Sequence, residues 1–448
     1  MSNKLINLDF FKSKFVTQIF WVVAGLGAAQ GLRLAGNLVL TRMLNPGDFG
    51  LLAIATSILV GVNMFSDVGL GGAVIRSNKT DRPGYMETIW TLSAIRGVVI
   101  GILLLLVAYP VSIFYGHPEL VYIIASYTAI SVAMGCASAN LWLYDKKLDL
   151  RKRIINEFLS QLFSIVVMIV WAWISPSYWA LVGGAVSSAL FFSIFSHFIY
   201  KGNRPKIHWD KEAIYEVFHY GKWVFPATAV TYVASQGDRL IMGAVLAIEE
   251  VGVYTIAATF ASLVTMIIGK ITMRVLQPLF KQYHDRNNIH GIRNVRLAII
   301  CASACICILA AIWGDKIIEC LYDDRYIDGG WMLQLLSIRG IAVGLAATMA
   351  AYVLAVGQPK ANFHYEATNA CILVAGMLMG AKYGLAAMIL AYTAGPFICL
   401  PVLVRSVRKE GLQTAHTDIP ILLSSIGIIV LGWVLSDSVV LVEIYKIF

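Results

Sequence analysis

The sequence predicts an all-α polytopic membrane protein, and two observations carry that prediction. Hydrophobic residues make up 58% of the 448 residues and charged residues only 14%, whereas a soluble domain carries about 25% charged residues. The apolar residues also fall in runs of about 20, long enough to cross a bilayer, from one end of the chain to the other. No polar stretch is long enough to form a water-soluble catalytic domain.

The apolar runs indicate about 13 transmembrane helices, twelve forming a core and one added at the C-terminus. We expect them at 17–40, 50–70, 88–109, 118–141, 155–174, 179–200, 221–246, 251–271, 296–314, 331–356, 363–382, 384–404 and 419–441. This division predicts four parts of the chain. They are an N-terminal six-helix lobe (1–200), a cytoplasmic inter-lobe linker (201–220), a second six-helix lobe (221–404), and a cytoplasmic loop with the extra helix (405–448).

Basic residues alternate strongly between the two sides of this predicted topology. Most of the 35 Lys and Arg lie at the N-terminus and in every second loop, and the other side holds only Arg42, Lys316, Arg325, Lys382 and Lys446. Because cytoplasmic loops carry the excess of Lys and Arg, the N-terminus is expected in the cytoplasm. The net charge of +9 is therefore explained by membrane topology and does not predict nucleic-acid binding.

A weak internal repeat relates the two predicted lobes. Three residues that follow the first span recur after the seventh at a constant offset of 202: Leu44, Asp48 and Gly50 match Leu246, Glu250 and Gly252. The offset covers six spans, so both halves enter the membrane in the same orientation. Such a parallel repeat, about an axis along the membrane normal, is typical of transporters.

Charged side chains deep inside a span cost about 2.5–3.5 kcal/mol each and usually serve a function. The candidates are Arg33, Arg96, Asp238, Arg239 and Arg339. Counting about 1.5 Å per residue places Arg33, Arg239 and Arg339 in the outer half of the membrane and Arg96 in its inner third. The uncharged polar residues Gln30 and Asn37 lie on the same helix as Arg33.

Among these residues only Asp238 is an obvious partner for an arginine, and on a helix it points about 100° away from its neighbour Arg239. Guanidinium groups suit phosphate or carboxylate, so we expect a central cationic cavity for an anionic substrate. The alternative is that each arginine pairs structurally with a carboxylate or a helix C-terminus. Asp67 and Glu366, nearer the cytoplasmic ends, are candidate groups for a coupling ion, as is Asp238.

Other chemistry has little support in the sequence. The seven cysteines and eight histidines show no metal-ligand spacing, so no metal or organic cofactor is expected, with H+ or Na+ coupling left open. No phosphate-binding glycine-rich loop, HExxH or GxSxG motif is present.

Four segments resemble the polysaccharide transporters of the multidrug/oligosaccharidyl-lipid/polysaccharide flippase superfamily, in particular their colanic-acid-exporter type. They are Leu40-Thr41-Arg42-Met43-Leu44-Asn45-Pro46-Gly47-Asp48-Phe49-Gly50-Leu51, Asp67-Val68-Gly69-Leu70-Gly71, Phe114-Tyr115-Gly116-His117-Pro118-Glu119-Leu120 and Gly237-Asp238-Arg239-Leu240-Ile241-Met242-Gly243. The resemblance extends over essentially the whole chain. Its departure is at the C-terminus, because family members often have fourteen spans.

This resemblance implies two six-helix lobes around a central cavity, in the inner membrane of a bacterium. It implies a flippase that moves undecaprenyl-diphosphate-linked oligosaccharide units from the cytoplasmic to the periplasmic leaflet, for exopolysaccharide, capsule or O-antigen assembly, alongside a polysaccharide polymerase. Cavity arginines would hold the diphosphate: Asp238 and Arg239 match by position, Arg33 fits the general pattern, and Arg96 and Arg339 are assigned from depth alone.

Three other functions are weighed against this one. A cation-coupled drug exporter of the same superfamily favours buried carboxylates, but the first span has none. A lipid II flippase would bind a chemically similar prenyl diphosphate. A membrane polysaccharide polymerase or ligase needs catalytic residues outside the membrane, and no long external loop is predicted to carry them.

Overall fold

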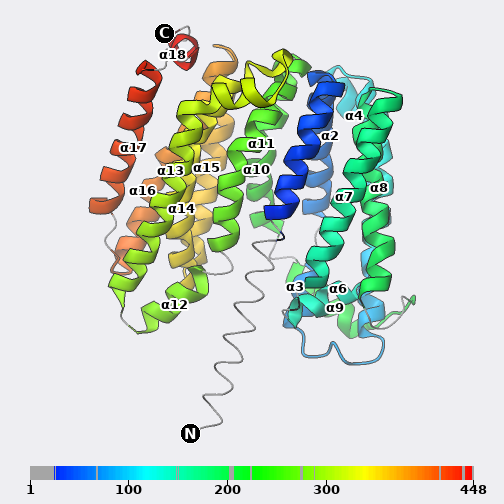
Figure 1. Ribbon diagram of the computed structural model, residues 1–448. Helices are drawn as coiled ribbons and strands as arrows, with labels where there is room; N and C mark the ends of the chain where they lie inside the picture. The colour runs from blue at the N-terminus through cyan, green and yellow to red at the C-terminus, as the bar shows by residue number, and fades with distance from the viewer. Residues whose placement is uncertain are drawn as a thin grey trace. The chain divides into compact units, whose positions relative to one another are not determined.

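The computed structural model describes residues 25, 27–66, 69–147, 149, 151–200, 206–221, 225–272, 276–286, 288–412, 415–435 and 439–445. These residues form helices joined by short turns, with no strand among them, and they divide into two compact units, 1–229 and 230–448 (Figure 1). Nine of the described helices are long and apolar enough to cross a membrane. The all-α membrane fold is confirmed, while the count of thirteen spans stays a prediction.

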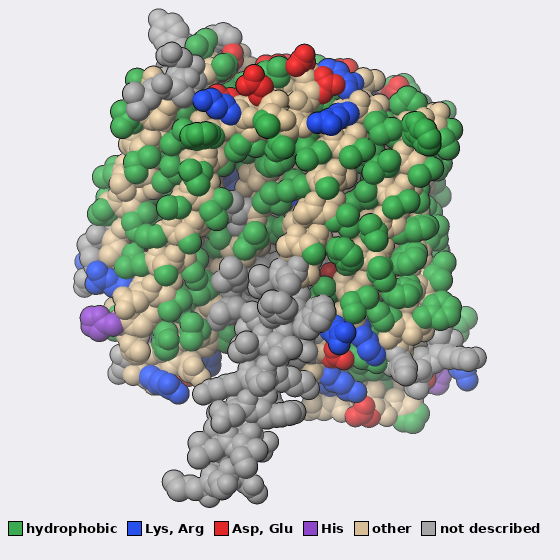
Figure 2. Space-filling view, viewed as in Figure 1, with side chains coloured by type: hydrophobic (Ala, Val, Ile, Leu, Met, Phe, Trp, Pro, Cys, Tyr) green, Lys and Arg blue, Asp and Glu red, His purple; other side chains and the backbone are tan. Residues whose placement is uncertain are grey.

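The surface agrees with a membrane environment. Hydrophobic side chains cover the helices between their ends, and most of the visible charged side chains gather toward the helix ends (Figure 2). Large apolar side chains are exposed along the helices, among them Leu106, Trp173 and Leu309. Exposed apolar surface of this extent fits lipid contact.

The first unit is built from one helix at 27–43 and eight that follow it. They are α2 (Pro46–Phe65), α3 (Leu70–Arg76), α4 (Tyr85–Tyr115), α5 (Glu119–Cys136), α6 (Asn140–Lys146), α7 (Arg151–Ile174), α8 (Tyr178–Ile199) and α9 (Lys211–Gly221). Helix α4 packs on α5, and α7 packs on α8. At the α4–α5 crossing a Cβ atom on Gly97 would lie 2.6 Å from the Ser131 carbonyl oxygen, so only glycine allows these backbones to approach so closely.

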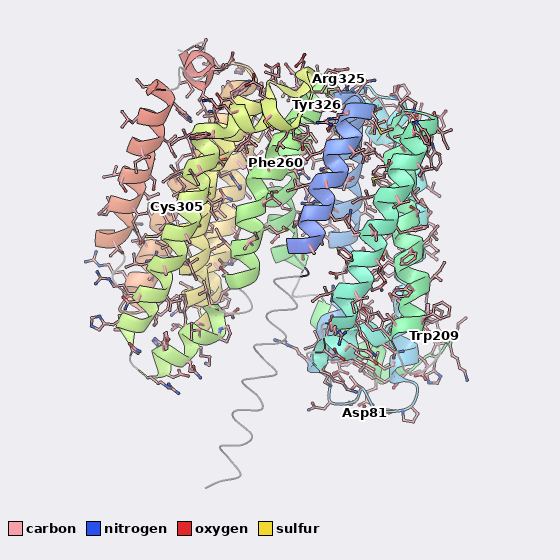
Figure 3. All side chains as sticks on the ribbon, in the orientation of Figure 1. Asp81, Trp209, Phe260, Cys305, Arg325 and Tyr326 are labelled. Carbon is pink, nitrogen blue, oxygen red and sulfur yellow. The ribbon has the colours of Figure 1, made fainter. Side chains whose placement is uncertain are left out.

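The second unit contains most of α10 and the eight α-helices after it. They are α10 (Phe225–Val245), α11 (Ile248–Ile271), α12 (Gln277–Asp285), α13 (Ile289–Leu321), α14 (Gly329–Ala355), α15 (Pro359–Gly380), α16 (Leu385–Lys409), α17 (Ala415–Leu435) and α18 (Val439–Tyr445). A one-turn 3-10 helix, η2 (Asp324–Tyr326), lies between α13 and α14; Arg325 and Tyr326 are labelled there (Figure 3).

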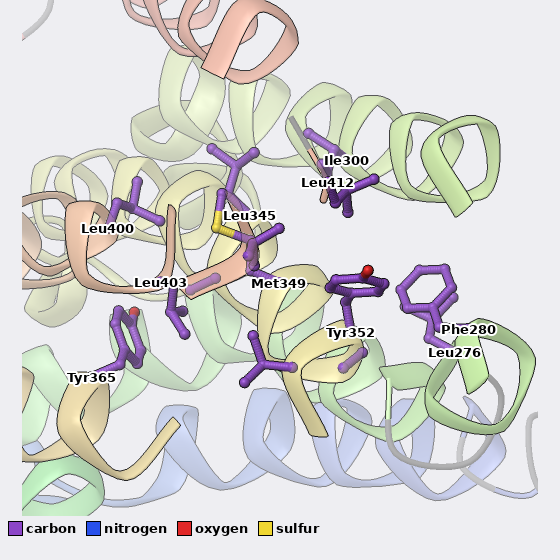
Figure 4. Close-up of a cluster of buried hydrophobic side chains, with 14 of the residues drawn as sticks. Leu276, Phe280, Ile300, Leu345, Met349, Tyr352, Tyr365, Leu400, Leu403 and Leu412 are labelled. Atoms are coloured by element: carbon purple, nitrogen blue, oxygen red, sulfur yellow. The ribbon is translucent and has the colours of Figure 1, made fainter. Parts of the chain in front are cut away.

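Helix α14 lies at the centre of the second unit. It contacts α11, α13 and α16, and most of its apolar stretch is buried inside the protein, whereas most of that of α17 is not. Its residues Leu345, Met349 and Tyr352 form a buried cluster with Phe280 and Leu403 from the neighbouring helices (Figure 4). Arg339, the charged residue of α14, is half-buried in this otherwise largely buried helix.

The two units share part of their helix order. The third helix of each is short (α3 and α12), and the fourth is the longest, with 31 residues in α4 and 33 in α13. Two helices pack as a neighbouring pair at the end of each repeat, α7 with α8 and α15 with α16.

The predicted linker at 201–220 contains a helix, α9, that packs on the first unit. Its Ala213 and Val217 are buried against residues of α3 and α4, and Glu216 accepts hydrogen bonds from Ser77 (3.2 Å) and Tyr85 (3.3 Å). Trp209, just before α9, is labelled at this end of the unit (Figure 3). The sequence missed this helix because it is too short and too polar to read as a span.

Candidate functional site

Four of the helices in the second unit bring charged and phenolic side chains together. Asp238 and Arg239 come from the C-terminal third of α10, Tyr254 from α11, Arg339 from α14 and Tyr392 from α16. Arg339 interacts electrostatically with both Asp238 and Tyr254. The sequence analysis had selected Asp238, Arg239 and Arg339, and the structure brings them together.

The α10–α11 turn explains why Asp238 meets Tyr254. Only residues 246 and 247 separate the two helices; Asp238 lies seven residues before Val245, and Tyr254 lies six residues after Ile248. Two antiparallel helices joined this closely place such residues at the same level. The Tyr254 hydroxyl donates a hydrogen bond of 2.6 Å to Asp238 Oδ2, and the two residues are 0% and 4% exposed.

Arg339 lies about 15 Å from the start of α14 at the usual rise per residue. Its guanidinium carbon stands 4.1 Å from the centre of the Tyr392 ring, a cation–π contact that orients the guanidinium plane. Glu366 is half-buried on α15 and interacts electrostatically with Arg339. The site thus contains two arginines and two carboxylates within one unit.

Neither arginine of this site is paired. Across the described residues, no carboxylate oxygen lies within 4.0 Å of the Arg239 or Arg339 guanidinium, and the Nε atoms of both are buried without a hydrogen-bond acceptor. A buried donor left unsatisfied costs about 1–3 kcal/mol, and more when it is charged. Two forked cations held in this way form a site suited to an anion with several oxygen atoms.

The first unit holds the other predicted site residues. Gln30, Arg33 and Asn37 are half-buried on the helix 27–43, and their spacing of three and four residues places them on one helical face. The same helix packs on α7 through Gly36, where a Cβ atom would lie 3.0 Å from Ile165. Whether these three side chains bind substrate stays a prediction.

Arg96 has acceptors that the sequence did not reveal. Its Nε donates to the Ser66 carbonyl (3.0 Å) and its Nη2 to the Asn63 carbonyl (2.8 Å), at the C-terminal end of α2. A cation at this position satisfies otherwise unpaired carbonyls and the negative end of the helix dipole. This is the structural alternative considered for each arginine, and substrate binding by Arg96 stays a prediction that no contact tests.

The coupling-ion candidates differ in what can be said of them. Asp67 lies outside the described residues, whereas Glu366 lies close enough to Arg339 to interact with it. Within the described part of the chain no group of three or more His, Cys, Asp or Glu side chains is placed to hold a metal ion.

Sequence reasoning missed two tyrosines of the site and one ion pair outside it. Tyr254 was detectable, because it lies about as far after the 246–247 turn as Asp238 lies before it. Tyr392 has no comparable signal. The ion pair joins Arg296 of α13 to Asp418 of α17 at 2.7 and 3.1 Å, and both side chains are buried.

The helical units, lipid-exposed surface and buried charges define a polytopic membrane protein with a transporter fold. Two solved structures share that fold: the lipid II flippase MurJ, with a TM-score of 0.74 and 13% identity over 96% of both chains, and a multidrug resistance transporter of the MATE family, with a TM-score of 0.63 and 11% identity over 85% of this chain and 94% of that one.

The chain belongs to the polysaccharide biosynthesis protein family, whose model matches residues 39–329. Relatives include the lipopolysaccharide biosynthesis protein WzxC of Escherichia coli, 21% identical over 83% of this chain and 76% of that protein. The succinoglycan biosynthesis transport protein ExoT of Rhizobium meliloti is 20% identical over 83% of this chain and 76% of that protein. The resemblance to polysaccharide transporters inferred from the sequence motifs is confirmed.

Proposed function

We propose that this protein is a flippase for undecaprenyl-diphosphate-linked oligosaccharide units in the inner membrane of a bacterium. It moves them from the cytoplasmic to the periplasmic leaflet by alternating access, for exopolysaccharide, capsule or O-antigen assembly. The observation that carries the proposal is a pair of half-buried arginines, Arg239 and Arg339, whose buried Nε atoms have no hydrogen-bond acceptor among the described residues, in a chain of a polysaccharide biosynthesis family.

The diphosphate is the part of this substrate that needs such a site. The prenyl tail is apolar, whereas the diphosphate carries negative charge that must leave water during translocation. Two guanidinium groups offer forked donors to phosphate oxygens and replace the lost hydration. In this proposal Arg239 and Arg339 hold the diphosphate, and Gln30, Arg33 and Asn37 supply further donors to the headgroup.

The remaining parts of the proposal concern topology and energy. The N-terminus faces the cytoplasm, as the distribution of Lys and Arg favours. Arg96 lies toward the inner leaflet, where the headgroup is first met. Coupling to H+ or Na+ uses Glu366, Asp238 or Asp67, and a polysaccharide polymerase receives the translocated unit. No catalytic step is assigned to this chain.

The experiment uses a strain that lacks the protein but still synthesises the lipid-linked unit. Oriented membrane vesicles are treated with an impermeant glycosidase or lectin to find the leaflet in which the unit accumulates. We expect accumulation on the cytoplasmic face, relieved by the wild-type protein but not by Arg239→Ala or Arg339→Ala. The matched control is Arg293→Ala, because Arg293 is exposed on α13 of the same unit.

Two outcomes would contradict the proposal. Normal export by Arg239→Ala, with the protein present in the membrane, would remove the arginine site from the mechanism. Units that reach the periplasmic face without the protein would mean that translocation occurs elsewhere, and the polymerase and drug-exporter alternatives would then be tested directly.

A further inference from the structure

Asp238 is the natural partner for both site arginines, yet it pairs with neither. It precedes Arg239 in the chain and interacts electrostatically with Arg339, but neither guanidinium lies within 4.0 Å of it. Its Oδ1 atom is buried without any hydrogen bond in the described part of the chain. The helix geometry separates Asp238 from its neighbour Arg239, but it does not explain why the buried carboxylate leaves Arg339 unpaired, since opposite charges attract more strongly away from water.

Tyr254 is the group that holds it. Its hydroxyl donates to Asp238 Oδ2 at 2.6 Å, a short charge-assisted bond of the stronger kind. Tyr254 is fully buried, and its place one and a half turns into α11 leaves its ring little freedom to move. The bond therefore fixes the carboxylate on the α11 side of α10.

On the other side of the site, Arg339 is restrained by a second tyrosine. The Arg339 guanidinium carbon lies 4.1 Å from the centre of the Tyr392 ring on α16, a cation–π contact through the face of the ring. The N–H donors of a guanidinium lie in its own plane, so a contact through the ring face leaves them directed at other acceptors. The two tyrosines hold the opposite charges apart.

We propose that Tyr254 is a positioning residue that keeps Asp238 from neutralising Arg339, so that this guanidinium remains available to the anionic substrate beside Arg239. The inference rests on the proposed function, because it assigns to Tyr254 a role in the same arginine site. Without the tyrosine hydroxyl, Asp238 is free to turn toward an arginine and compete with the substrate phosphate groups.

The test measures binding of inorganic pyrophosphate to the purified full-length protein in lipid nanodiscs by calorimetry. We expect Tyr254→Phe to weaken binding about tenfold, which corresponds to about 1.4 kcal/mol. Adding Asp238→Asn to Tyr254→Phe should restore the affinity to near the wild-type value, because the neutral amide no longer competes for the arginines. A tyrosine that only supports packing would not be rescued by a change at Asp238.

Several results would overturn the inference. Wild-type affinity in Tyr254→Phe, or no recovery in the double variant, would show that Tyr254 does not act through Asp238. If Tyr254→Phe is not recovered folded, Asp238→Asn alone decides: we expect binding at least as tight as wild type, and a tenfold loss would make Asp238 a binding group instead of a competitor.

The proposed function is tested separately in the same assay. Arg239→Ala and Arg339→Ala should each lose pyrophosphate binding whatever Tyr254 does. If these variants bind like the wild type, or if the wild type does not bind pyrophosphate, the arginine site itself fails and the role of Tyr254 fails with it. If only the tyrosine variants behave unexpectedly, the arginine site stands and the positioning role alone is wrong.

Discussion

Two regions of the second unit surround an arginine with different partners. Arg296 on α13 is 3% exposed and is held by both carboxylate oxygens of Asp418 and by the Thr348 hydroxyl at 3.1 Å. Arg339 on α14 is half-buried, contacts the face of the Tyr392 ring and has no carboxylate oxygen within 4.0 Å among the described residues. Withdrawing a cation from water is costly, and Arg296 has a carboxylate at contact distance that compensates this cost, whereas Arg339 does not. We infer that the paired arginine supports the fold and the unpaired one serves a ligand.

The paired region connects α17 to the unit. Besides the Arg296–Asp418 pair, the Trp433 indole donates to the Ala311 carbonyl at 2.6 Å. Both contacts join residues 122 positions apart, so α17 runs parallel to α13 in one constant register. A polar contact at each end of the helix pair sets that register.

The largest expected effect is the loss of stability when the paired arginine, Arg296, is replaced. Arg296→Met leaves the Asp418 carboxylate buried without its cation, and breaking a buried pair from one side costs about 3–5 kcal/mol. We expect a marked loss of folded protein and a lower thermal unfolding temperature in detergent, measured by size-exclusion chromatography after heating.

The control is the double variant Arg296→Met with Asp418→Leu, which removes both charges and keeps an apolar contact. Replacing a buried pair by hydrophobic residues is often neutral or stabilising, so most of the stability should return. A double variant as unstable as the single one would show that the pair does not act through its buried charges.

The second effect compares two Arg→Ala substitutions. Arg96→Ala removes the hydrogen bonds to the Ser66 and Asn63 carbonyls, which are worth about 1.5–3 kcal/mol when the donor is charged. Arg239→Ala removes donors that have no acceptor, so we expect no loss of stability. Thermal unfolding of the two variants measures the difference directly.

The same two variants, Arg96→Ala and Arg239→Ala, should differ in function in the opposite order to their difference in stability. Arg239→Ala should lose export, while Arg96→Ala should retain pyrophosphate binding in proportion to the folded protein recovered. Complete loss of binding by a well-folded Arg96→Ala variant would return Arg96 to the substrate site, as its depth in the sequence first indicated.

These contrasts show what was readable from the sequence. Hydropathy and the spacing of basic loops predicted the long helices, because both signals are local. The unpaired arginines were found because charge deep in an apolar run is itself unusual. The pairing of Arg296 was not visible, because its partner lies 122 residues away and Arg296 was taken as the first residue of its span.

Arg96 shows a second limit of sequence reasoning. Its acceptors are backbone carbonyls of α2, and no residue type marks a carbonyl that needs a donor. The short helices α3, α6, α9 and α12 were missed for a related reason. Each has only seven to eleven residues, so its position depends on contacts made after the long helices have packed.

A third, smaller effect is expected on pyrophosphate binding when Arg339 is replaced by lysine. Arg339→Lys keeps the positive charge but loses the planar fork and much of the stacking on Tyr392. We expect pyrophosphate binding to weaken about tenfold, corresponding to about 1.4 kcal/mol, with stability unchanged. Calorimetry on Arg339→Lys and Arg339→Ala measures this, and equal losses in the two variants would show that charge alone contributes nothing.

The smallest effect is expected where charges are fully exposed. Glu212 on α9 is paired with Lys79 and Arg82 of the loop before α4, and the hydrogen bond from Lys79, followed by that from Arg82, lowers the pKa of Glu212 below its ordinary value. The contribution of the Glu212 ion pairs to folding stability is fully present above the usual glutamate pKa of about 4.3. It is lost as the pH falls through the lower pKa of the folded state.

Between neutral pH and pH 3.5, the wild type should therefore lose slightly more thermal stability than Glu212→Gln, whose side chain does not titrate. The matched control is Asp81→Asn, because Asp81 is exposed in the same loop and should follow the wild-type curve. Solvent and salt screen an exposed ion pair much more than a buried one. A loss of stability as large as that of Arg296→Met would therefore contradict the comparison between exposed and buried pairs. Identical curves for the wild type and Glu212→Gln would mean that the Glu212 ion pairs add nothing to the contacts that α9 makes through Ala213, Val217 and Glu216.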